Sequence, residues 1–237
     1  MEDNQVKAVK YLIKQAPAGE IQDVLQHLHT LVGSPEQISQ SDQIMKAIKT
    51  WYETHKYHIT LSDGSVAMVT AQGCIATGEE ANPMEWFQYY DDVLKKSFTF
   101  DPITQSASIN EGDLPEPATS QFRADLITET GHMIEEKYRK GKALFSVTQG
   151  DDENHQIIEI SCQNYKLESF WSGEWLSTFS VKDGVLSGDL KVRCHFFEMG
   201  NMQFNLDKQF DSIACSDTTS PKEILKAISN IENKVSF

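Results

Sequence analysis

Five segments between Leu144 and Phe210 have the composition of β-strands: LFSVT (144–148), QIIEISCQNY (156–165), EWLSTFSV (174–181), SGDLKVRCHFF (187–197) and MQFNLDKQF (202–210). They are rich in β-branched and aromatic residues. The links between them are short and carry turn residues, as in Lys182-Asp183-Gly184 and Met199-Gly200-Asn201. Short turns of this kind join antiparallel neighbours, so we predict a five-stranded antiparallel meander.

The predicted sheet needs cover on at least one face, because apolar and polar residues alternate along its fourth strand. The alternating apolar residues are Leu190, Val192, Cys194 and Phe196. Helical spacing of apolar residues marks one helix before the strands and one after them. These positions are Phe122, Leu126, Ile127, Met133, Ile134 and Tyr138, then Ile224, Leu225, Ile228, Ile231 and Val235. We expect the two helices to cover the sheet, and a partner strand to cover its edge.

The N-terminal part reads as three helices. Ala16-Pro17-Ala18-Gly19 separates the first from the second, and Ser34-Pro35-Glu36-Gln37 is a typical helix start. Their apolar stripes are Val6, Val9 and Ile13; Ile21, Val24, Leu25, Leu28 and Leu31; and Ile44, Met45, Ile48, Trp51 and Tyr52. After Tyr57 the pattern favours short strands around an Asp63-Gly64 turn. The segment from Asp101 to Thr119 is rich in Pro, Ser and acidic residues, which predicts a long exposed loop.

These elements predict an α+β chain in three parts. Residues 1–56 form a three-helix stalk, and residues 57–119 form a middle strand and loop region. Residues 120–237 form one structural unit of helix, antiparallel central sheet and C-terminal helix.

Composition excludes several classes of function. The chain has 35 acidic and 21 basic residues, for a net charge of −14, and no cluster of Lys and Arg that could neutralise phosphates. We therefore expect no nucleic-acid partner. The sequence contains no run of about 18 apolar residues, so we predict no membrane span. The cysteines at 74, 162, 194 and 215 fit no zinc or disulfide spacing, so free cytosolic thiols are expected.

A search for catalytic and metal-binding motifs leads to no site. The chain lacks G-x-S-x-G, P-loop and G-x-G-x-x-G motifs, and the acidic residues around Asp151 do not follow the calcium-loop pattern. Cys194 and His195 are adjacent on a predicted strand, so their side chains point to opposite faces. We predict no catalytic residue, metal or cofactor. A small α+β enzyme using His195 or Cys194 remains an alternative, and a concave pocket beside them would favour it.

Four short motifs stand in a fixed order along the chain. They are Ala16–Glu20 (APAGE), Phe170–Trp175 (FWSGEW), His195–Met202 (HFFEMGNM), and Lys222–Ile224 (KEI) with Ile231–Asn233 (IEN). They resemble, respectively, the A-P-P-G-E break, the F-W-[NS]-G-x-W strand, the aromatic–acid–Gly-Asn turn and the final helix of F-actin capping protein alpha subunits. Order and spacing agree from about Val6 to Val235. Met199 departs from the pattern, because the family usually has aspartate there.

The resemblance implies the mushroom fold of that family and a non-enzymatic role in the cytoplasm and cytoskeleton. Its members dimerise, cap the barbed end of actin filaments and block subunit addition and loss. The expected partners are the actin barbed end, a capping protein beta subunit or a second copy of this chain, phosphoinositides and capping regulators. A dimeric scaffold that has lost actin binding is the other alternative. The dimer-interface sheet is expected to include Leu190, Val192, Cys194 and Phe196.

The family's basic C-terminal tail, or tentacle, which holds actin, has no counterpart up to Phe237. The net charge of −14 should repel acidic actin at long range. We therefore expect a chain that folds and dimerises but caps weakly. The remaining cations near this end are Lys222, Lys226 and Lys234, which are the candidates for actin contact.

Overall fold

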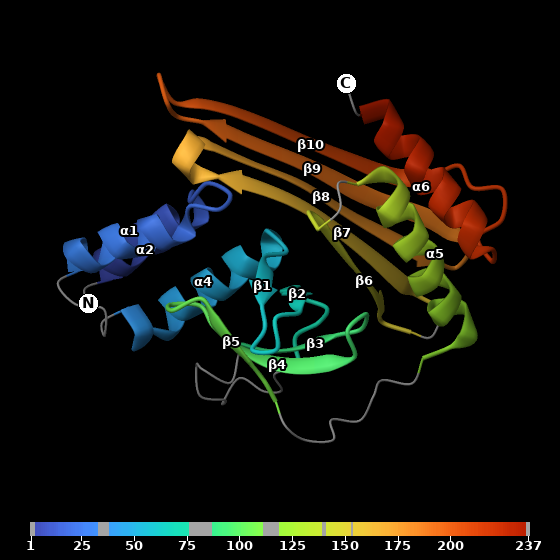
Figure 1. Cartoon of the computed structure of the whole chain (residues 1–237), viewed down its shortest axis with the longest axis horizontal. Helices are drawn as coiled ribbons and strands as arrows, with labels where there is room; N and C mark the ends of the chain where they lie inside the picture. The colour runs from blue at the N-terminus through green and yellow to red at the C-terminus, as the bar shows by residue number, and fades with distance from the viewer. Residues whose placement is uncertain are drawn as a thin grey trace.

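A computed structural model describes residues 3–32, 38–75, 87–110, 119–138, 141–152 and 154–235 of the 237-residue chain. It contains a helical bundle, a middle layer of short strands and a long five-stranded sheet covered by two helices (Figure 1). None of the helices it describes has the length and apolar character needed to cross a membrane.

The five-stranded sheet has the predicted up-and-down order, β10-β9-β8-β7-β6, with every pair antiparallel. Its strands are β6 (Ala143–Gln149), β7 (Gln156–Lys166), β8 (Trp171–Lys182), β9 (Val185–Phe196) and β10 (Met202–Ile213). Strand β8 begins three residues before the predicted start at Glu174. A short 3₁₀ helix and the left-handed Phe170, at φ 56°, turn the chain so that Trp171 already pairs with Lys166.

Helices α5 (Gln121–Lys137) and α6 (Pro221–Val235) cover one face of this sheet, as predicted (Figure 1). The hydroxyl of Ser120 accepts a hydrogen bond from the backbone N–H of Arg123 and caps α5. Helix α6 begins at Pro221, in agreement with the Ser220-Pro221 signal. The core beneath the helices is built from Leu126, Met133, Val147, Ile158, Ile160, Phe179, Val181, Leu186, Ile213, Ile224, Leu225, Ala227 and Ile228.

The N-terminal bundle consists of α1 (Asp3–Lys14), α2 (Ile21–Val32) and α4 (Asp42–Thr54). The predicted helix start at Ser34-Pro35-Glu36-Gln37 lies outside the described residues, and α4 follows Ser41. The bundle shares one hydrophobic core with the middle strands, which contribute Ile59, Ala67, Tyr89, Phe98 and Phe100. The predicted boundary between residues 56 and 57 therefore separates helices from strands, but both sides share one hydrophobic core. As a domain boundary it stays a prediction.

The middle layer contains a two-stranded and a three-stranded sheet, both antiparallel. They are formed by β1 (His58–Thr60) with β2 (Val66–Met68), and by β3 (Gln88–Asp91), β4 (Lys96–Asp101) and β5 (Ser106–Ile109). The predicted loop from Asp101 to Thr119 is wrong in its first half, because β5 pairs with β4 there. The strand was missed because Ser106-Ala107-Ser108-Ile109 carries little apolar area. Residues 111–118 lie outside the described part.

Candidate interaction surface

Strand β10 forms an open edge of the long sheet. It pairs with β9 from Met202 opposite Phe196 to Ile213 opposite Leu186, and within the described residues no strand pairs with its other side. Almost all of its 12 residues are exposed or half-exposed. An edge of this length offers a row of backbone N–H and C=O groups to another strand.

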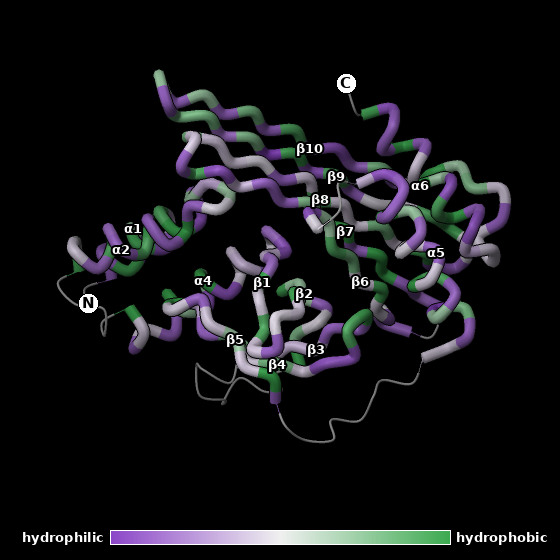
Figure 2. The backbone as a smooth tube through the Cα atoms, in the orientation of Figure 1, coloured by the Kyte–Doolittle hydropathy of each residue, from purple (hydrophilic) through white to green (hydrophobic). Residues whose placement is uncertain are grey.

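An apolar patch adjoins this edge at the β9–β10 turn. It consists of Met199, Met202 and Phe204, which are 90%, 69% and 49% exposed. Helix α6 lies over the opposite end of β10 (Figure 1), where Phe210 and Ile213 pack against the core. Figure 2 shows apolar and polar residues alternating along these outer strands. Exposed apolar side chains grouped beside an open strand edge mark a surface suited to a protein partner.

The predicted interface residues Leu190, Val192, Cys194 and Phe196 lie on β9, one strand inside the edge. Leu190 is fully buried and the other three are half-buried. Both sides of β9 are occupied by β8 and β10, so backbone pairing with another chain falls to β10. The prediction chose β9 because apolar and polar residues alternate more clearly along it than along β10. The position of β10 as the last strand of the meander was the signal that could have identified the edge.

The three candidate lysines are all exposed on α6 but do not form one cluster. Lys222 and Lys226 have side chains 77% and 69% exposed and lie 3.9 Å from Glu129 and 3.6 Å from Glu223. Lys234 lies in the last turn. A helix rises about 1.5 Å per residue, so Lys222 and Lys234 are roughly 18 Å apart.

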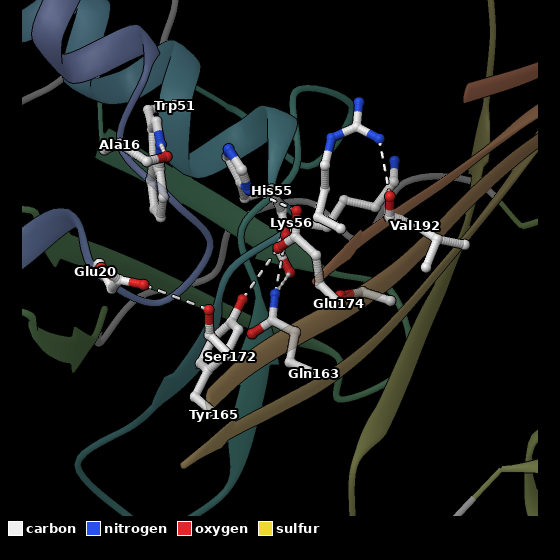
Figure 3. Close-up of polar contacts among 12 residues, drawn as sticks. Ala16, Glu20, Trp51, His55, Lys56, Gln163, Tyr165, Ser172, Glu174 and Val192 are labelled. Carbon is white, nitrogen blue, oxygen red and sulfur yellow. Dashed lines mark hydrogen bonds and ion pairs between the residues drawn. The ribbon is translucent and has the colours of Figure 1, made fainter. Parts of the chain in front are cut away.

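A polar joint connects the helical bundle to the side of the long sheet opposite α5 and α6 (Figure 1), and Figure 3 shows its side chains. His55 at the end of α4 lies 2.7 Å from Glu174 on β8, and Tyr165 donates to the same carboxylate at 3.1 Å. The next residue, Lys56, forms a buried ion pair with Glu159 on β7. Sequence reasoning missed this joint, since His55 and Lys56 stand more than 100 positions from their partners on the sheet.

Gly19 shows why the Ala16–Glu20 break has its composition. Its φ is +81°, which favours glycine, and a Cβ there would come within 2.8 Å of the Tyr165 ring on β7. The following Glu20 then reaches His195 on β9, with 2.6 Å between Oε1 and Nδ1. The break therefore allows the connection between α1 and α2 to pack directly against the long sheet.

His58, on β1 beside the joint, is held neutral. Burial lowers its pKa to about 4, and its ring Nε2 lies 3.1 Å from the hydroxyl of Ser161. The unfolded chain takes up a proton near pH 6.5, whereas the folded chain resists it until about pH 4. The stability that His58 contributes is therefore complete above pH 6.5 and is lost as the pH falls toward 4.

We expect His58→Gln to lose this pH dependence. Between pH 7 and pH 4.5, the free energy of unfolding of the native chain should fall by roughly 2–3 kcal/mol more than that of the variant. Burial raises the pKa of Asp92 to about 6, which acts in the opposite direction but equally in both proteins. Urea unfolding at several pH values measures the difference. Parallel curves for the two proteins would show that His58 titrates normally.

A cavity of about 610 Å³ lies between the bundle and the sheet. Its lining includes Lys10 and Lys14 of α1, Trp51 of α4, and Cys194 and His195 of β9. A concave pocket, the feature that would favour the enzyme alternative, is therefore present beside Cys194 and His195. His55 and Glu174 of the polar joint also line this cavity.

The groups in the cavity wall are not arranged for nucleophilic catalysis. The two ring nitrogens of His195 lie 2.6 Å from Glu20 and 2.9 Å from Asn201, so neither addresses the thiol of Cys194. Burial raises the pKa of the Cys194 thiol, with Glu174 adding to the effect. A catalytic thiol needs the opposite shift. All four cysteines are free and half-buried.

Comparison with known proteins gives one consistent result. The family model described as F-actin capping protein alpha subunit matches residues 9–236. The F-actin-capping protein subunit alpha of Schizosaccharomyces pombe is 22% identical over 226 residues, covering 94% of this chain and 81% of that protein. That of Kluyveromyces lactis is 29% identical over 231 residues, covering 94% and 79%. That of Arabidopsis thaliana is 23% identical, covering 88% and 70%.

The fold also has a solved counterpart. The homodimeric actin capping protein alpha subunit from Plasmodium berghei superposes with a TM-score of 0.74 at 18% sequence identity, covering 98% of this chain and 90% of that one. The agreement extends over the bundle, the middle strands and the long sheet together.

Proposed function

Because this chain belongs to the F-actin capping protein alpha subunit family, we propose that it is one subunit of a dimeric cap on the barbed end of actin filaments. The observation that carries the proposal is the open 12-residue edge of β10. A cap has to span the actin subunits at the filament end, and joining two sheets edge to edge builds a platform longer than one chain can supply.

Dimerisation accounts for the exposed surface of the isolated chain. A strand added to β10 would satisfy its outward backbone groups, and apolar cover would remove Met202 and Phe204 from water. The half-buried Val192, Cys194 and Phe196 on β9 would lie beside the same cover. The partner is a beta subunit or a second copy of this chain.

The proposed role is binding without chemistry, in the cytoplasm at the actin cytoskeleton. Lys222, Lys226 and Lys234 stay the candidates for actin contact, because their exposed cations are suited to an acidic filament. The same lysines would serve anionic lipid headgroups, so phosphoinositides and capping regulators remain proposed partners. The spacing of the lysines favours three weak contacts over one strong site.

Elongation of pyrene-labelled actin from filament seeds tests the capping proposal. The purified protein should slow growth at free barbed ends and leave growth unchanged on seeds whose barbed ends are already blocked. Replacing all three lysines with glutamine should weaken the effect without changing the dimer. Unslowed elongation together with no co-sedimentation with filaments would overturn the capping proposal and favour the alternative, a dimeric scaffold that has lost actin binding.

A further inference from the structure

We propose that the chain binds a short extended segment of another protein along β6, with one apolar side chain as the anchor and a lysine or arginine beside it. Strand β6 is the edge of the long sheet opposite β10, and within the described residues it pairs with β7 alone. The proposal goes beyond the capping role, because an edge at the far side of the sheet stays open whatever covers β10.

Alternate residues of β6 direct their backbone groups away from β7. The backbone N–H of Gln163 donates to the carbonyl of Lys142 at 2.9 Å, so these two residues form a hydrogen-bonded pair of the ladder. Because such pairs alternate in an antiparallel ladder, Leu144 also bonds to β7, whereas Ala143 and Phe145 turn their N–H and C=O groups outward. No hydrogen bond from the described part of the chain reaches these outward groups, so a partner strand could satisfy them.

A groove of about 190 Å³ lies beside these outward groups. It is bounded by α5 on one side and by β2 and the β3–β4 turn on the other, and Figure 1 shows α5 and β2 on either side of β6. A typical site for a small molecule has roughly 300–1,000 Å³, so this groove suits a single large side chain better. Its apolar lining includes Val66, Val93, Leu94, Ile134, Leu144 and Phe145.

The groove is open and apolar at its mouth. Val66 and Val93 are 40% and 38% exposed, although both border the groove. Gly131 keeps the opposite wall low, because α5 carries no side chain at that point. Glycine inside a helix is destabilising relative to alanine, and a Cβ at this position would meet the Phe145 ring at 3.7 Å, an ordinary contact. Packing therefore does not require glycine there, whereas an open groove does.

The charges around the groove favour a basic partner. Its described lining contains two carboxylates, Asp91 and Glu135, and no cation. Asp91 already accepts hydrogen bonds from backbone N–H groups of its own turn, and the nearby Lys96 pairs with Asp63. Glu135 is exposed, and no cation of the described chain lies within ion-pair distance of it. Glu135 is therefore the group that a partner's lysine or arginine would meet.

These features together match the way in which an extended peptide adds to a sheet edge. Backbone hydrogen bonds to Ala143 and Phe145 would provide affinity, because they are independent of the peptide's sequence. The groove would select an apolar side chain on one side of the peptide, and Glu135 would select a basic residue next to it. The occupant is thus a basic and apolar β-strand rather than an acidic or uniformly polar one.

Three labelled peptides test the chemistry of the occupant on the whole chain by fluorescence anisotropy. The heptapeptide T-V-K-L-K-V-T should bind at least about tenfold more tightly than T-V-E-L-E-V-T, whose charge is reversed. It should exceed T-S-K-S-K-S-T by a similar factor of about ten, since that peptide keeps the charge and lacks the apolar anchor. Equal binding of the three peptides, or preference for the acidic one, would overturn the proposal.

Two pairs of variants locate the peptide. Glu135→Lys should weaken binding of T-V-K-L-K-V-T at least about threefold. Glu136→Lys is its matched control, because Glu136 is the next exposed residue of α5 and does not line the groove. Gly131→Met should fill the groove and weaken binding at least about tenfold, whereas Gly131→Ala should preserve it. Equal effects within either pair would mean that the peptide binds elsewhere or through overall charge.

Hydrogen exchange tests strand addition without any substitution. With the peptide bound, the amides of Ala143 and Phe145 should exchange at least about tenfold more slowly, because each would donate to a peptide carbonyl. The amide of Leu144 is the internal control and should change less, since it already bonds to β7. Unchanged exchange at both outward amides would overturn strand addition.

This inference and the capping proposal stand or fall separately. All four variants should slow actin elongation as the unaltered chain does, because β6 lies at the opposite edge from β10. Lost peptide selectivity with intact capping would overturn the docking site alone. Loss of capping in Glu135→Lys or Gly131→Met, with the fold intact by circular dichroism, would place β6 in the actin-binding surface and overturn its assignment as a separate site.

Discussion

Lys56→Met should lower the free energy of unfolding by about 3–5 kcal/mol, because it leaves the buried carboxylate of Glu159 without its cation. Glu159 is 3% exposed, and its remaining described contact is the Ser146 hydroxyl at 3.4 Å. Methionine keeps most of the side-chain volume, so the loss reports on the charge rather than on a cavity. Lys56 also has a φ of 45°, and methionine bears the same backbone strain.

Denaturant unfolding at pH 7 and one fixed protein concentration measures this loss, since dimerisation makes stability depend on concentration. Lys182→Met is the matched control, because Lys182 pairs with the exposed Asp151 at 3.3 Å and should change stability by less than about 1 kcal/mol. The double variant Lys56→Met with Glu159→Leu should recover most of the loss. A single variant no less stable than the control would mean that the joint tolerates an unpaired Glu159.

Met202→Lys combined with Phe204→Lys should weaken the dimer by at least about 100-fold and reduce capping equally. Both side chains are exposed in the isolated chain, so its own stability should change little. In the dimer, each introduced ammonium group would have to leave water beside an apolar surface, which costs free energy because the charge has no partner there. The two substitutions are therefore expected to weaken the association of the subunits and to leave the stability of each subunit nearly unchanged.

Analytical ultracentrifugation measures the dissociation constant, and actin elongation from seeds measures capping. Val185→Lys is the control, because Val185 is also exposed but lies far from Met202 and Phe204. It is the first residue of β9, next to the β8–β9 turn, whereas Met202 pairs with Phe196 at the other end of that strand. It should leave both readouts unchanged. If the double variant still formed a tight dimer, the interface would lie away from the β10 edge. If it were monomeric and still capped, the dimer would not be the active form.

Elements that depend on interactions between nearby residues were predicted correctly, whereas those that depend on distant residues were missed. The meander was predictable because each hairpin needs only a turn and two alternating segments, as with Lys182-Asp183-Gly184 between β8 and β9. The α6 start at Pro221 was likewise local. Strand β5 was missed because its stability comes from β4, with Ala107 opposite Phe100, rather than from its own composition.

The need for a partner at the sheet edge was predicted from the sequence, and the assignment of Leu190, Val192, Cys194 and Phe196 to the dimer interface stays a prediction. A sheet edge needing a partner followed from the strand count alone, yet the residues chosen were on β9, because alternation reveals a buried face and carries no information about strand order. The Glu20–His195 contact spans 175 positions, so no pattern in the chain could indicate it.

The helices and the five strands of the long sheet, with the turns between them, followed from residue periodicity and turn residues, because short-range sterics and hydrogen bonding set them within a few positions. The docking of the bundle on the sheet, the cavity beneath β9 and the pairing of Lys56 with Glu159 depended on the folded chain. These features arise where distant segments meet, and the free energy of burying a charge is set by the partners that folding brings to it.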